Sequence, residues 1–321
     1  MALDRRTMLA TTAAATGLLK AGCLESLNPD EPHREHLPDE ELVDPAAMET
    51  RWLAAPDEEP YDFGVASPIG IDENDVHLEV ERTGMYVGAT RYLRALAERR
   101  AEELDQITFV DLSLPPEHHA DGVVLEGDLE ASDVVETLEG WEGDALQIVD
   151  EASHGGYELY VLGRGDVFAV EDGTVILSGA GFPADEASRT HVEEIIDAAV
   201  GDRTNYVDEE PDLAEVLKYV ERGQIVEAGM GKIRENAPEE TLAFGQSITV
   251  LQGLTELFFA AIFADEETAD ANADAMEGLV AEFDMVMDQE VQVEDRVASL
   301  DATVDWSIEA GNGPDLEPGG I

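Results

Sequence analysis

The hydrophobic positions of this chain fall into two strand-rich blocks, separated by a stretch with helical spacing. Alternation with a period of two predicts strands, and apolar residues spaced by three and four predict helices. Residues 107–162 read as strand, strand, helix, strand, strand, and residues 242–306 repeat that order. We therefore predict an α+β fold, with antiparallel sheets that carry helices on one face.

The predicted bounds follow from where each pattern starts and stops. The first block has strands at 107–114, 123–129, 146–151 and 157–162, and a helix at 132–138 with Ser132 or Asp133 as its cap. Between the blocks we predict a hairpin at 167–171 and 174–178, around Asp172-Gly173, and helices at 185–200 and 211–221. The second block has strands at 242–251, 254–264, 285–293 and 297–306, and a helix at 266–283. The length and apolar character of 254–264 suit a strand buried on both faces.

Composition divides the chain into five parts. Residues 1–23 form a leader, and residues 24–60 form an acidic, proline-rich tether that its charges and prolines keep extended. We predict an α+β domain over 61–235 and a smaller α+β block over 236–308. A flexible tail over 309–321 completes the division.

Acidic residues dominate the composition: 74 Asp and Glu stand against 18 Lys and Arg, and the formal net charge is −56. Repulsion on this scale destabilises a compact chain at low ionic strength, but the Debye length is only about 3 Å at 1 M salt. Only Lys218 and Lys232 follow the leader as lysines. In its acid excess and lysine depletion the chain resembles secreted proteins of extremely halophilic archaea. Nucleic acid is excluded as a partner, because phosphate binding needs a basic surface.

The leader places Arg5-Arg6 just ahead of an apolar run at 9–19. That run is too short to span a bilayer, which takes about 20 apolar residues, and it therefore reads as part of a signal. Arg-Arg followed by apolar residues resembles the twin-arginine export signal. The resemblance implies an exported protein.

The leader ends at Cys23, in a stretch that resembles the lipobox of exported lipoproteins. Lys20 stands where that family has Leu, and Leu19 lies one place further back. The resemblance implies a lipid on Cys23 and attachment to the outer face of the cell membrane. An ordinary cleaved signal, which would leave the protein extracellular, is the alternative. Cys23 is the only cysteine, so the chain forms no internal disulfide.

A cluster of arginines gives this acidic chain one concentrated positive stretch. Arg91, Arg94, Arg99 and Arg100 lie in a predicted amphipathic helix at 85–104 and form a candidate patch for an anion or a protein partner. The alternative is pairing with glutamates one turn along the same helix.

Two adjacent histidines are the weak candidates for a metal site. His118 and His119 follow a Pro-Pro-Glu stretch, with Asp111 and Asp121 nearby in the sequence. Histidine and carboxylate are ligands that zinc accepts. The sequence contains no motif that specifies a cofactor, so the identity of any cofactor is left open.

Export, the tether and the lack of a catalytic constellation in the sequence together favour a surface-anchored, non-enzymatic protein with a binding or envelope role. Two alternatives stay open: a secreted, metal-dependent enzyme, and a solute-binding lipoprotein. Convergence of His118, His119 and Asp111 in one pocket would favour the enzyme. Two lobes around a cleft would favour the solute-binding protein. The sequence does not specify the ligand.

Overall fold

The computed structural model describes residues 42–45, 48, 50–57, 60–67, 104–113, 119–140, 147–178, 186–231, 238–251, 254–280 and 286–305. Every described residue belongs to one compact unit within Asp39–Ile321. The leader and the tail lie outside the described residues.

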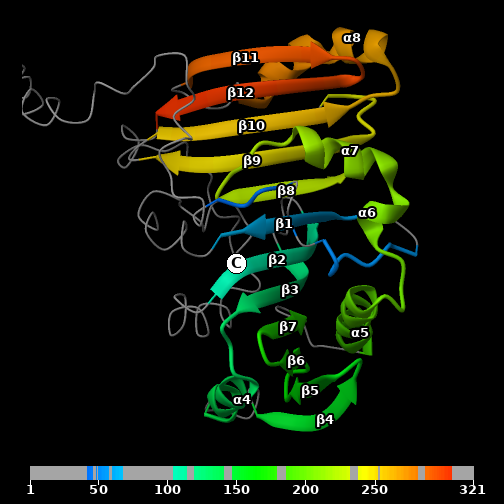
Figure 1. Cartoon of the computed structure of the whole chain (residues 1–321), viewed down its shortest axis with the longest axis vertical. Coiled ribbons are helices and arrows are strands. Elements are labelled where there is room, and N and C mark those ends of the chain that lie inside the picture. The colour runs from blue at the N-terminus through cyan, green and yellow to red at the C-terminus, as the bar shows by residue number, and fades with distance from the viewer. Residues whose placement is uncertain are drawn as a thin grey trace, which may run out of the picture. The chain divides into compact units, whose positions relative to one another are not determined.

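Twelve strands and five α-helices are seen in these residues (Figure 1). The strands are β1 (Asp62–Ala66), β2 (Leu104–Ser113), β3 (His119–Gly127), β4 (Ile148–His154), β5 (Tyr157–Leu162), β6 (Val167–Glu171), β7 (Thr174–Ser178), β8 (Ile225–Met230), β9 (Ala243–Leu251), β10 (Leu254–Ile262), β11 (Val286–Glu294) and β12 (Val297–Asp305). The helices are α4 (Ala131–Glu139), α5 (Glu186–Val200), α6 (Tyr206–Glu209), α7 (Pro211–Tyr219) and α8 (Glu266–Glu277), which a 3₁₀ turn, η6 (Gly278–Val280), extends. The predicted α+β class is confirmed.

All twelve strands join one antiparallel sheet in the order β11-β12-β10-β9-β8-β1-β2-β3-β7-β6-β5-β4. Both predicted blocks are present in it, as β2-β3-α4-β4-β5 and β9-β10-α8-β11-β12. In each block the fourth strand lies inside the third, so that β4 and β11 form the two edges of the sheet. The first block differs by one insertion, the β6–β7 hairpin, which lies between β3 and β5.

Two strands that the sequence analysis did not predict join the blocks. β1 pairs with β2, β8 pairs with β9, and β1 and β8 pair with each other at the centre of the sheet. β8 falls in the range 61–235 and β9 in the range 236–308, so the described strands of the two predicted domains share one sheet.

Along its inner strands the sheet is apolar and buried on both faces. β10 shows this directly, because Phe259 and Ala261 belong to one core cluster and Phe258 and Ala260 to the other. The first face is covered by the block helices α4 and α8, which lie on one side as predicted. Helices α5, α6 and α7 pack on the opposite face. A sheet that is apolar on both sides requires this second layer.

The second half of the predicted tether belongs to the folded unit. Trp52 and Leu53 are almost fully buried in the core cluster beneath α5, α6 and α7. Val43 forms a β-bridge with Gly223, and Ala54 forms one with Asn205. The prediction of an extended tether over 24–60 is therefore wrong for these residues. Burial of the indole and leucine side chains outweighs the local content of proline and charge.

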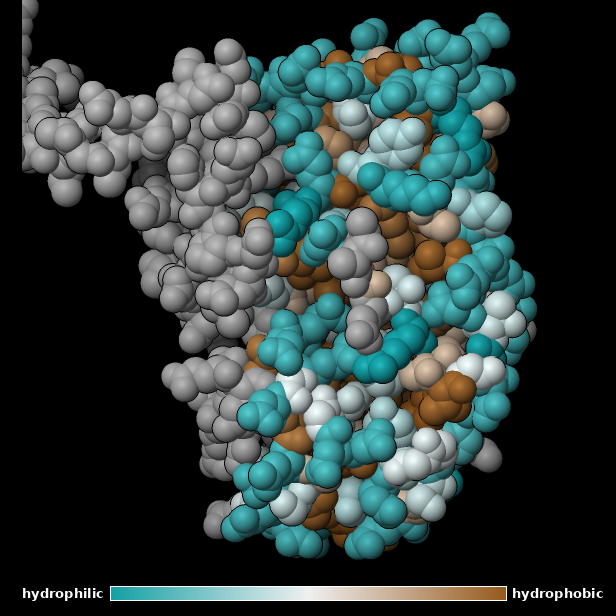
Figure 2. All heavy atoms as spheres, in the orientation of Figure 1, coloured by the Kyte–Doolittle hydropathy of each residue, from teal (hydrophilic) through white to brown (hydrophobic). Residues whose placement is uncertain are grey.

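Hydrophilic residues cover most of the face in view in Figure 2, and apolar residues stay in separate patches among them. Charged contacts between elements include Arg296 in the β11–β12 turn, whose Nη2 lies 2.6 Å from Asp212 Oδ1 on α7. None of the described helices has the length and apolar character needed to cross a membrane.

Candidate functional site

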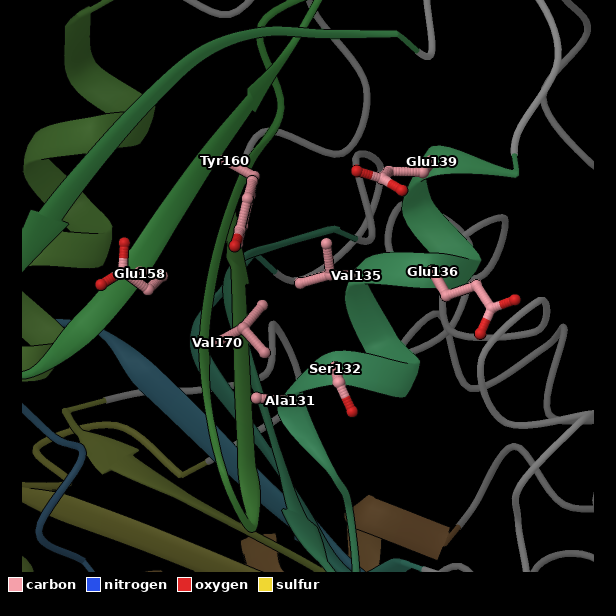
Figure 3. Close-up of a pocket in the computed structure, with 8 residues that line it drawn as sticks. All are labelled: Ala131, Ser132, Val135, Glu136, Glu139, Glu158, Tyr160 and Val170. Carbon is pink, nitrogen blue, oxygen red and sulfur yellow. The ribbon is translucent and has the colours of Figure 1, made fainter.

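An open groove of about 360 Å³ lies between α4 and the strands β5 and β6 (Figure 3). One wall is α4, which contributes Ala131, Ser132, Val135, Glu136 and Glu139. The opposite wall is formed by Glu158 and Tyr160 of β5 and by Val170 of β6. We take this groove as the candidate functional site.

Helix α4 is amphipathic in a way that leaves one apolar side chain for the groove. Val134 and Leu138 are buried in the core, which fixes the helix on β6. Val135 is only partly buried and points from α4 toward Val170, whereas Glu136 points away from the strands (Figure 3). Because successive helical residues are about 100° apart, the core contacts of Val134 place Val135 on the side of the groove.

The start of α4 is fixed by a residue that is distant in sequence. The N-cap is Glu130, whose side chain makes no capping hydrogen bond, so the prediction of Ser132 or Asp133 as cap is wrong. Asp172, in the β6–β7 turn, accepts a hydrogen bond from the backbone N–H of Ala131 at 3.0 Å. A carboxylate is favourable at this position because the first N–H groups of a helix lack partners in the helix.

The strand wall of the groove follows from the register of the β5–β6 hairpin. Tyr160 pairs with Phe168, and Glu158 pairs with Val170. Alternation places Tyr160 and Val170 on the same face as the core cluster beneath α4. Tyr160 is partly buried and packs against that cluster, while Glu158 is exposed at the rim.

The groove is electrostatically negative. Burial raises the pKa of the Tyr160 phenol, and the charges of Glu158, Glu151 and Glu139 raise it further. The phenol therefore stays protonated and can donate a hydrogen bond. The glutamates supply oxygen acceptors, and the floor supplies an apolar and aromatic surface. Such a lining can hold a cationic or hydrogen-bond-donating group, and it disfavours anions.

The second block packs its helix directly on its last two strands. There α8 packs on β11 and β12 through Ala269 and Met276, against Val291, Val293 and Leu300. In the first block α4 packs on β6, and the groove lies beside this contact, along Glu158 and Tyr160 of β5.

Most of the sequence-predicted site residues lie outside the described part of the structure. Arg5, Arg6, Cys23 and His118 lie outside the described residues, as do the four arginines of the candidate patch, Arg91, Arg94, Arg99 and Arg100. His119 is the first residue of β3, where its backbone pairs with Ser113, but its side chain is not described. Among the described residues, no three His, Cys, Asp or Glu side chains gather in an arrangement suited to a metal ion.

Sequence reasoning missed the groove residues for a physical reason. It predicted the helix that carries Val135, the strand that carries Tyr160 and the hairpin after them. It did not predict that the hairpin would lie between β3 and β5 in the sheet. Periodicity also does not reveal a histidine–aspartate pair: His154 Nε2 of β4 lies 2.6 Å from Asp197 Oδ1 on α5. This pair fastens α5 to the edge strand β4.

Comparisons with known proteins give no family. No family model matches the chain, and no curated protein matches it. Among solved structures, crystal form III of TP0453 matches with 7% identity and a TM-score of 0.44, over 81% of this chain and 95% of that one. Crystal form I of TP0453 matches with 10% identity and the same TM-score, over 82% and 93%. A likeness at this level supports no conclusion about function.

Proposed function

We propose that this chain is an exported, surface-anchored protein with a non-enzymatic binding role, held at the outer face of the cell membrane by a lipid on Cys23. The observation that carries the proposal is the leader, in which Arg5-Arg6 precede a short apolar run that ends at Cys23. The acidic composition supports it, because an exported domain of this charge suits a solvent of high ionic strength.

The binding role is supported by the groove beside α4. A binding site needs a concave surface with an apolar floor and a few polar groups that fix orientation. Val135, Val170 and Tyr160 supply the floor, and Glu139 and Glu158 supply the polar groups. The charge of the lining and the volume of the groove then determine which class of ligand can bind.

Replacement of the lipid-bearing residue tests the anchor. We expect Cys23→Ser, made in a halophilic host, to move most of the protein from the membrane pellet to the medium, because a thioether-linked lipid cannot form on serine. Fractionation and immunoblotting of intact cultures measure this. As a control, Arg5→Lys with Arg6→Lys should leave the protein inside the cell. If the Cys23→Ser protein still pelleted with the membrane, the proposal of a lipid anchor on Cys23 would be rejected.

A further inference from the structure

We propose that the groove beside α4 binds an ammonium group carried on a short apolar body. The inference rests on the proposed binding role and names its ligand class. Val135 and Val170 offer apolar contact, the ring of Tyr160 offers a face for a cation, and Glu139 lies on the same side of α4 as that ring (Figure 3). These groups come from three separate elements and converge on one hollow.

Negative charge alone would not direct a cationic ligand to this groove, because carboxylates are common over the whole chain. In molar salt the Debye length is about 3 Å, so carboxylates act only on groups in direct contact. A carboxylate on an open surface then holds a solvated sodium or potassium ion as readily as an organic cation. Tyr160, Val135 and Val170 add contacts that favour an alkylated cation, because cation–π and apolar contacts persist in salt.

The difference between the two blocks points to the same site. The second block closes its helix on the sheet with apolar side chains, including Met276 and Leu300. The first block has an additional hairpin, uses Asp172 of that hairpin to hold α4, and leaves Tyr160 and Glu158 along an open groove.

The ligand could be supplied in two ways with the same chemistry. A free small ammonium compound would fit the groove whole, and the ammonium and methylene stem of a lysine on another protein would fit from outside. The groove's volume of about 360 Å³ suits a group of this size and leaves room for bridging water. An anionic group in direct contact with the glutamates of the lining is disfavoured.

The test is isothermal titration calorimetry of the full chain in molar NaCl. The probes are choline, its uncharged isostere 3,3-dimethylbutan-1-ol, and a short lysine-rich peptide. We expect choline or the peptide to bind and the alcohol not to bind. Tyr160→Leu should weaken binding about three- to fivefold, the range of one cation–π contact. Glu139→Gln should weaken it by up to about fivefold, the range of one exposed ion pair. Asp274→Asn on α8, an exposed acid far along the sheet, should change nothing.

The outcomes separate the possibilities. Choline binding that both groove variants weaken supports a small-molecule ligand, and peptide binding alone supports a protein partner. No heat from either cation, equal heat from the alcohol, or binding that neither variant alters overturns the proposal. The Cys23→Ser fractionation tests the lipid anchor independently of the groove. A negative calorimetry result would therefore not count against the anchor, and continued pelleting of the Cys23→Ser protein would not count against ligand binding. Near-UV circular dichroism of each variant confirms that the fold is intact.

Discussion

Tyr157 shows at the scale of one residue how burial changes a group's chemistry in this chain. Burial and the neighbouring charge of Glu171 raise its pKa to about 12. The neutral phenol is therefore favoured by the fold. Its contribution to stability is fully present below about pH 10, the usual tyrosine pKa, and is lost as the pH rises through 12.

This gives a prediction for alkaline solution. Between about pH 9 and pH 11 the wild-type chain should lose about 1 kcal/mol more of its unfolding free energy than Tyr157→Phe, which has no proton to release. Denaturant unfolding in molar salt at both pH values measures the difference. Tyr206, whose pKa is also raised by burial, is present in both proteins and so cancels. An equal loss in the two proteins would show that the Tyr157 phenol ionises as readily in the fold as in the unfolded chain.

A second residue-scale feature is a polar pair inside the sheet. Gln246 of β9 donates its amide N–H to Glu227 of β8, and both side chains are buried among apolar neighbours. Register places them directly opposite each other. Such a pair fixes strand register, since a slip of one residue would bury the glutamate without its partner. Sequence alone could not show this, because β8 was not predicted.

At the scale of elements, the α4 helix depends on the hairpin beside it. Asp172→Ala should lower the unfolding free energy by about 1 kcal/mol, the usual cost of losing a capping acceptor. Asp172→Asn keeps both an acceptor oxygen and a residue suited to the turn, so it should stay within about 0.5 kcal/mol of wild type. Thermal unfolding in molar salt compares the two. Equal destabilisation by both changes would contradict the capping role.

The edge strands show how the sheet limits pairing with other chains. The register of β4 skips Val149, and that of β11 skips Met287, so each edge strand carries a bulge near its start. These skipped side chains are 63% and 62% exposed. Bulges and charged residues at an edge hinder the addition of another strand. This matters in molar salt, where charge repulsion alone protects an edge poorly.

Most of the elements could be predicted, because each carries its own periodicity. Apolar residues alternate along β12 and recur at helical spacing along α5, because each element buries one face. β1 and β8 were missed because they are short, contain glycine, and owe their strand structure to partners far away in the chain. The groove was missed for the same reason: it depends on which strand lies beside β5, and periodicity does not report neighbours.

At the scale of the whole molecule, charge sets the conditions under which the fold persists. We expect dialysis from molar NaCl to low salt to abolish the near-UV circular dichroism signal, because the net charge of −56 is then unscreened. Ion pairs such as Arg51–Glu126 and Arg203–Glu194 offset only a small part of it. Restoring ionic strength with KCl should protect the signal as well as NaCl does. A signal that survives at low salt would show that packing alone suffices.

The central β1–β8 pair also has a consequence for the order of synthesis. Asp62 and its partner Gly229 are 167 residues apart, and a ribosome adds roughly 5–20 residues per second. β1 therefore leaves the ribosome about 8 to 33 seconds before the strand that pairs with it. During that interval β1 lacks the strand that pairs with it on one side in the finished sheet. A protein exported in the folded state would have to wait until β8 pairs with β1 before it could leave the cell.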